Sequence, residues 1–187
     1  MSLLESKNIP LGSKLPEFVL KDPYGKDYDI KKQIAKNGLL VFITCNHCPY
    51  ARAVWERVKE IIRFAKKLEV NAIAVNPNIH PNYPDDSPAK MKEKIEDEKL
   101  DFPYLVDETQ EFSKLLDAVC TPDIYLFDKN AKLYYHGRLD DNWQDKLKVE
   151  KEDLKDALIL LFTGKKPPMP QYPSMGCSIK WLDTVVG

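Results

Sequence analysis

One sequence feature constrains the fold of this chain most. It is a β-strand pattern that runs directly into an amphipathic helix pattern, with two cysteines at the junction. Leu39 to Thr44 form a continuous apolar, partly β-branched run, which is typical of a parallel strand covered on both faces. From Pro49 to about Leu68, apolar residues recur every three or four positions and charged residues fill the remainder. The segment therefore predicts a strand followed by a long helix, with Cys45 and Cys48 between them.

Further along the chain, the same alternation continues and then gives way to an antiparallel pattern. The periodicity predicts strands at 70–75 and 104–106, helices at about 88–99, 109–118 and 152–163, and a hairpin from 124–127 and 133–139. Parallel crossovers followed by a hairpin indicate a mixed central sheet with helices on both faces. We therefore expect an α/β fold of three layers, α/β/α.

The two ends of the chain carry short patterns outside this core. Residues 18–28 hold an apolar run, a Pro/Gly turn and a return, which predict an N-terminal β-hairpin. Residues 165–173 contain too much proline for a helix or strand. Apolar residues and a cysteine return at 175–181, so we expect this proline-rich tail to dock back on the core.

A chain of 187 residues suits one domain with a single core. We expect an N-terminal β extension at 1–37, a core at 38–164 and a docking tail at 165–187. With 28 Lys and Arg against 29 Asp and Glu, no single-sign field exists to bind nucleic acid or an anionic membrane. The first residues lack the apolar core of a signal peptide, and the expected location is the cytoplasm.

The cysteine pair has the spacing that disulfide exchange requires. One thiolate must attack a disulfide, and a second thiol must be close enough to release the mixed disulfide. We expect both sulfurs on the first helical turn, where backbone N–H groups and the helix dipole lower a thiol pKa. Cys45 is the expected attacking residue, because the more N-terminal thiol is usually the exposed one, and His47 is expected to stabilise the thiolate.

Cys120, Thr121 and Pro122 precede the predicted strand at 124–127. A proline that keeps a strand start extended is compatible with a cis peptide bond, which leaves a backbone group for a substrate peptide. An ordinary trans proline is the alternative reading of the same residues.

A metal site is the main alternative for the cysteines. Soft ligands are available from the following residues: Cys45, Cys48, Cys120, Cys177 and His47. A second Cys-x-x-Cys is absent from the sequence, and a helix directly behind the pair does not form a zinc-knuckle turn. We therefore expect neither a metal nor a cofactor.

Six stretches of the chain together resemble the thioredoxin superfamily and, within it, the peroxiredoxin-like branch of the alkyl hydroperoxide reductase/thiol-specific antioxidant group. They are residues 45–50 (CNHCPY), 83–91 (YPDDSPAKM), 102–110 (FPYLVDETQ), 120–123 (CTPD), 137–141 (GRLDD) and 173–181 (PSMGCSIKW). The resemblance runs nearly end to end. It implies a thioredoxin fold, Pro122 as a cis-proline that faces the pair together with Thr121, and thiol redox activity. It also implies that Cys120 lies near the site, where it can pair with Cys177, form mixed disulfides or simply be packed. Cys177, in the family-like tail, is either a resolving cysteine or a buried anchor.

The resemblance argues less well for a peroxidase. Peroxidases of the peroxiredoxin type carry a Pro-x-x-x-Thr-x-x-Cys loop and a distal arginine. The threonine of that loop stands three residues before the cysteine. Here that position holds Cys45 relative to Cys48 and Phe42 relative to Cys45, so the threonine is missing, although Arg138 is available as the arginine.

Together, these features predict a thiol–disulfide oxidoreductase that acts through Cys45 and Cys48 on protein or small-molecule disulfides. Its expected partners are a disulfide-containing protein substrate and a reductant of the thioredoxin or glutathione type, with no nucleic acid and no membrane. A thiol-dependent peroxidase and a metal-binding or redox-sensing module stay open as alternatives.

Overall fold

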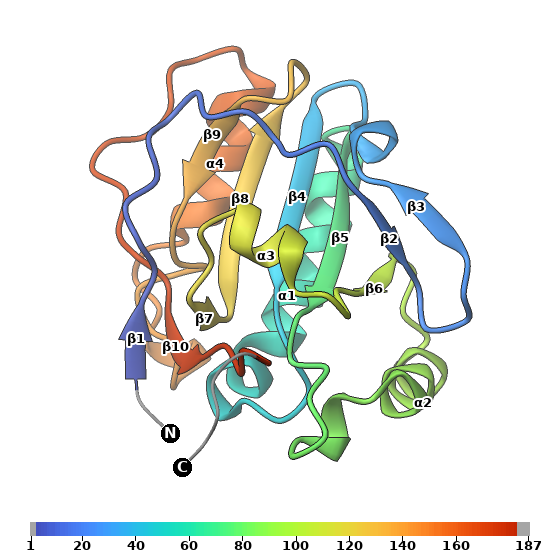
Figure 1. Ribbon diagram of the computed structural model, residues 1–187. Helices are drawn as coiled ribbons and strands as arrows, with labels where there is room; N and C mark the ends of the chain where they lie inside the picture. The colour runs from blue at the N-terminus through green and yellow to red at the C-terminus, as the bar shows by residue number, and fades with distance from the viewer. Residues whose placement is uncertain (1–2, 183–187) are drawn as a thin grey trace.

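A computed structural model describes residues 3–182 of the chain (Figure 1). Its strands are β1 (Leu3–Glu5), β2 (Val19–Lys21), β3 (Asp27–Asp29), β4 (Gly38–Ile43), β5 (Val70–Asn76), β6 (Tyr104–Val106), β7 (Cys120–Thr121), β8 (Asp123–Asp128), β9 (Leu133–His136) and β10 (Met175–Ser178). Its α-helices are α1 (Pro49–Lys67), α2 (Pro88–Glu98), α3 (Glu111–Leu115) and α4 (Asp153–Phe162). Short 3-10 helices lie at η1 (Lys31–Gln33), η2 (Pro84–Asp86) and η3 (Lys146–Lys148).

A mixed sheet of seven strands forms the middle layer of these residues, in the order β3-β2-β6-β5-β4-β8-β9. β4 pairs with β5 in parallel and with β8 antiparallel, so the cysteine-bearing strand end lies near the centre of the sheet. Figure 1 shows α1 and α4 behind the sheet and α3 in front of it. The predicted three-layer α/β fold with a mixed sheet is confirmed.

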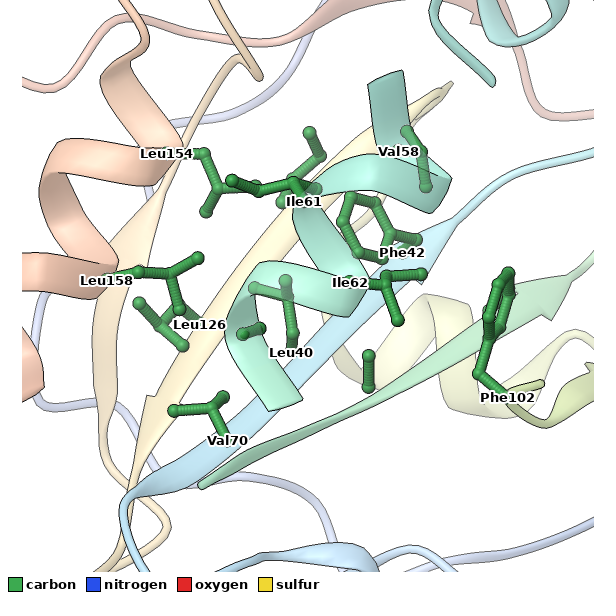
Figure 2. Close-up of a cluster of buried hydrophobic side chains, with 14 of the residues drawn as sticks. Leu40, Phe42, Val58, Ile61, Ile62, Val70, Phe102, Leu126, Leu154 and Leu158 are labelled. Carbon is green, nitrogen blue, oxygen red and sulfur yellow. The ribbon is translucent and has the colours of Figure 1, made fainter. Parts of the chain in front are cut away.

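The continuous apolar run of β4 is explained by burial on both faces. Leu40 and Phe42 point toward α1 and α4, where they join the cluster drawn in Figure 2. Leu39, Val41 and Ile43 belong to a second cluster on the opposite face. Since successive side chains of a strand alternate between faces, two covered faces require an unbroken apolar run. Within residues 3–182, no helix is long and apolar enough to cross a membrane.

Two predicted elements are longer than the real ones. The helix expected at 109–118 is confined to α3, because Gln110 and Asp117 adopt left-handed backbone angles with φ of 63° and 56°. The strand expected at 133–139 ends at His136, where Gly137 lies against the tail. A Cβ atom at Gly137 would stand 2.4 Å from the Tyr172 carbonyl oxygen.

Both chain ends pack onto the core as short strands. β2 and β3 form the hairpin predicted at 18–28, and β2 joins the sheet edge at β6. β10 is the middle strand of a separate sheet, β1-β10-β7, which the sequence did not indicate. Residues 1–2 and 183–187, which complete the predicted extension and tail, lie outside the described residues.

Candidate active site

The cysteine pair lies in a loop between β4 and α1. Cys48 is the N-cap residue of α1, and Pro49 takes the first helical position. A proline is favoured at that position because it has no N–H to donate and its φ is already helical. The expectation that both sulfurs sit on the first helical turn is therefore wrong: Cys45 precedes the cap by three residues.

Three sulfurs meet behind this loop. Cys45, Cys48 and Cys177 form one buried cluster with Ala51. Cys45 is 4% exposed and Cys48 is 0% exposed, so the expectation of an exposed Cys45 is wrong. All four cysteines of the chain are thiols in the structure.

Thr121 faces the pair from the strand that precedes Pro122. Its hydroxyl oxygen lies 3.3 Å from the Cys45 sulfur, and its carbonyl oxygen lies 3.0 Å from the Cys48 sulfur. The Thr121–Pro122 peptide bond is cis. The backbone beside it does not stand open for a substrate peptide as expected, because Thr121 is paired with Cys177 of β10.

The surroundings of the two catalytic candidates drive their pKa values apart. Hydrogen bonding from the Cys45 thiol, helped by the Cys177 thiol and the Ala51 amide, lowers the pKa of Cys48 to about 4 against the opposing effect of burial. Burial and the hydrogen bond to Cys48 raise the pKa of Cys45 well above its usual value. The Thr121 carbonyl oxygen opposes the lowering of the Cys48 pKa, since it accepts a hydrogen bond only from a protonated Cys48. These effects and the helix N-terminus therefore favour the negative charge on Cys48 over Cys45.

This assignment predicts a low thiolate titration in the reduced protein. Ultraviolet absorbance of the thiolate, followed from neutral to acid pH, should fall in one step near pH 4. The step should be absent from Cys48→Ser and unchanged in Cys120→Ser. A first thiolate that appears only at about pH 8.5, as for an unperturbed cysteine, would contradict the assignment.

Asp86 holds the loop between the cysteines. Its buried carboxylate accepts the Asn46 backbone N–H at 2.6 Å and the Asn76 side-chain amide at 3.2 Å, and it pairs with Nδ1 of His47. The His47 ring also stacks on Tyr83, with 4.8 Å between ring centroids. His47 is thus directed toward Asp86, and its expected role in stabilising the thiolate stays a prediction.

Asp86 and Asn76 are site residues that the sequence reasoning missed. Asn76 is the last residue of β5, next to the end of β4 from which the cysteine loop emerges. The carboxyl ends of neighbouring parallel strands share one edge of a sheet, which is where such α/β folds place their sites. That rule was the available signal for Asn76, and the signal for Asp86 was its place in the stretch 83–91 that carries the family resemblance.

One set of side chains in this loop has the composition of a metal site. Ligand atoms of Cys45, His47 and Asp86 all lie within 4.8 Å of one another. Nε2 of His47 is buried and has no hydrogen-bond partner. Thiolate, imidazole and carboxylate are donors that zinc accepts.

Two other predicted participants are not members of the sulfur cluster, although Cys120 lies beside it, next to Thr121. Cys120 is fully buried, and its thiol donates to the Pro122 carbonyl oxygen at 3.7 Å. Arg138, considered as a peroxide-binding arginine, donates from Nε to Asp153 at 2.7 Å and lies over the Tyr172 ring. Arg138 is therefore held by an ion pair, and it lines a cavity together with Pro122.

Comparison with known proteins gives a family model and close structural relatives. The Redoxin family model matches residues 10–158. An uncharacterized conserved protein from Geobacillus kaustophilus is 37% identical, with 98% of each chain covered and a TM-score of 0.93. A hypothetical protein from Sinorhizobium meliloti is 31% identical, with 96% of this chain and 99% of that chain covered and a TM-score of 0.88.

A more distant structure shares the fold alone. A putative Thiol:disulfide interchange protein DsbE from Chlorobium tepidum is 15% identical, with 83% of this chain and 99% of that chain covered and a TM-score of 0.63. Among curated proteins, no sequence matches this chain.

Proposed function

Since the chain belongs to the Redoxin family, we propose that it is a thiol–disulfide oxidoreductase whose redox couple is Cys45 and Cys48. The family and the shared fold confirm the thioredoxin superfamily and its peroxiredoxin-like branch, and with them a thiol redox function. The observation that carries the finer proposal is geometric: the two cysteines pack in one buried cluster at the N-terminus of α1, and both sulfurs contact Thr121.

In the proposed reaction, the Cys48 thiolate attacks one sulfur of a substrate disulfide. A Cys48–substrate bond forms, the substrate S–S bond breaks, and the leaving sulfur takes up a proton. Cys45 then loses its proton and attacks the Cys48 sulfur, which releases the second substrate thiol. The products are a reduced substrate and a Cys45–Cys48 disulfide, which an external dithiol or two monothiols return to the reduced state.

The proposed substrates are disulfides of proteins or small molecules, and the proposed reductant is of the thioredoxin or glutathione type. We place this activity in the cytoplasm, in keeping with a chain whose four cysteines are too few for a secreted disulfide scaffold. Reduction of insulin disulfides by the wild-type protein, driven separately by each reductant system, tests the proposal. Absence of exchange with both systems would overturn it.

A metal-binding module is the second candidate, favoured by the cluster of Cys45, His47 and Asp86. On this reading, the protein purified without chelators carries one zinc ion per chain and loses it in His47→Ala. Elemental analysis measures the zinc content of the wild-type protein, and a substoichiometric content would exclude a metal-binding function.

A further inference from the structure

The C-terminal strand occupies the backbone edge beside the cysteine pair. β10 runs antiparallel to β7, and the pairs are Cys177 with Thr121 and Ser178 with Cys120. On its other side β10 pairs with β1, where Leu3 lies opposite Cys177. Figure 1 shows β10 between β1 and β7, at the end of the molecule where α1 begins. The tail thus lies where an extended peptide would otherwise add to β7.

The close approach of β10 to Thr121 depends on a glycine. A Cβ atom at Gly176 would stand 1.9 Å from the Thr121 carbonyl oxygen. The absence of a side chain lets the next residue, Cys177, reach the cluster, where it is 1% exposed.

Hydrogen bonds on both sides of β10 hold it in this position. Ahead of the strand, the Ser174 hydroxyl donates to the Gly137 carbonyl at 2.7 Å. Behind it, the Ile179 N–H donates to the Val119 carbonyl at 3.0 Å, and the Lys180 N–H donates to Asn78 Oδ1 at 2.8 Å. Cys177 is therefore held against Cys48 by the fold, which removes most of the entropic cost of a reaction between them.

We propose that Cys177 is a third redox thiol of this site, which exchanges with the Cys45–Cys48 disulfide and locks the tail over it. This inference rests on the proposed function, because it starts from the oxidised pair. The deprotonated Cys177 sulfur attacks Cys48, a Cys48–Cys177 bond forms, and the Cys45–Cys48 bond breaks. The electron pair leaves on Cys45, which takes up the proton that Cys177 gave. The number of disulfides is unchanged, so the step needs no oxidant or reductant.

The reactivity of Cys177 follows the oxidation state of Cys48. In the reduced protein, burial and the hydrogen bond to Cys48 raise the pKa of Cys177 to about 12. When Cys48 is part of a disulfide it carries no charge, so the second of these effects disappears while Lys180 continues to favour the Cys177 thiolate. Cys177 therefore becomes a better nucleophile when there is a disulfide for it to attack.

Disulfide mapping over time tests the inference. The reduced full-length protein is treated with oxidised glutathione, quenched in acid at intervals, blocked with N-ethylmaleimide and digested for peptide mass analysis. We expect the Cys45–Cys48 disulfide first and the Cys48–Cys177 disulfide later, at its expense. The second product should be lost in Cys177→Ser and retained in Cys120→Ser, a buried cysteine outside the cluster. Gly176→Ala, which pushes β10 away from Thr121, should lower the Cys48–Cys177 fraction and leave Cys45–Cys48 in place.

The outcomes separate this inference from the proposed function. A wild-type protein that reduces insulin but forms only Cys45–Cys48, with Cys177 blocked at every time point, overturns the inference and leaves the function standing. A protein that forms Cys48–Cys177 but does not reduce insulin supports the reactivity of Cys177 and overturns the proposed activity instead. If Gly176→Ala fails to fold, the wild-type time course and the Cys177→Ser variant still test whether the Cys48–Cys177 disulfide forms.

Discussion

Replacement of Cys48 by serine is expected to reduce insulin-disulfide reduction to the rate measured without protein. A serine hydroxyl is not ionised at neutral pH and does not displace a disulfide sulfur, so the attacking group is lost. The double variant Cys45→Ser, Cys177→Ser should instead stop halfway, with an insulin chain bound to Cys48. Both candidates for the release of this mixed disulfide are then absent, because these are the two thiols that contact Cys48. Non-reducing electrophoresis and peptide mass analysis identify the bound chain and its position.

The reverse pattern would assign the attack differently. A mixed disulfide trapped on Cys45 in Cys48→Ser would show that the N-terminal cysteine attacks, in spite of its raised pKa. Cys120→Ser is the matched control, since Cys120 is equally buried but does not belong to the sulfur cluster. Its insulin reduction should equal that of the wild-type protein.

Replacement of Asp86 by alanine is expected to lower the free energy of unfolding by roughly 3 kcal/mol, since each buried donor left without an acceptor costs about 1–3 kcal/mol. The Asn46 N–H and the Asn76 amide both lose their acceptor in this variant. The loop between the cysteines also loses its anchor, so insulin reduction should fall with stability. Urea unfolding of the reduced protein measures the first effect, and the exchange assay measures the second.

Two neighbouring variants show whether the carboxylate itself is responsible. Asp85→Ala removes an exposed side chain from the preceding position, and its unfolding midpoint should match that of the wild-type protein. Asp86→Asn keeps an oxygen that can accept the Asn46 N–H, so it should lie between the wild-type protein and Asp86→Ala. Equal stability of Asp86→Ala and Asp85→Ala would refute the anchoring role of Asp86.

Local signals account for the parts of the fold that could be predicted. β4 could be found because both of its faces are buried, which requires an unbroken apolar run. α1 could be placed because Pro49 suits only a helix start and a single apolar face follows it. The prediction of α3 was too long, because left-handed angles at Gln110 and Asp117 leave no mark in the spacing of apolar residues.

Long-range contacts account for the site residues that could not be predicted. Asn46 and Asp86 are 40 residues apart in the chain, and Cys48 and Thr121 are 73 apart. The crossovers that bring such residues together are specified by packing of the whole sheet. The stretch 83–91 carries the family resemblance, but the spacing of its residues does not show that Asp86 will be buried beside the cysteine loop.

By itself, the sequence determined that two cysteines stand between a buried strand and a helix, since strand, proline and helix are all signalled between Leu39 and Leu68. Only the tertiary structure decided which of the two thiols is more readily deprotonated and where the sulfur of Cys177 lies. Charge on Cys48 is favoured because Cys45, Cys177 and the helix end converge on it, and Cys177 is there because β10 pairs with β7. Charge and accessibility at a thiol depend on what surrounds it in space, which the spacing of residues along the chain does not contain.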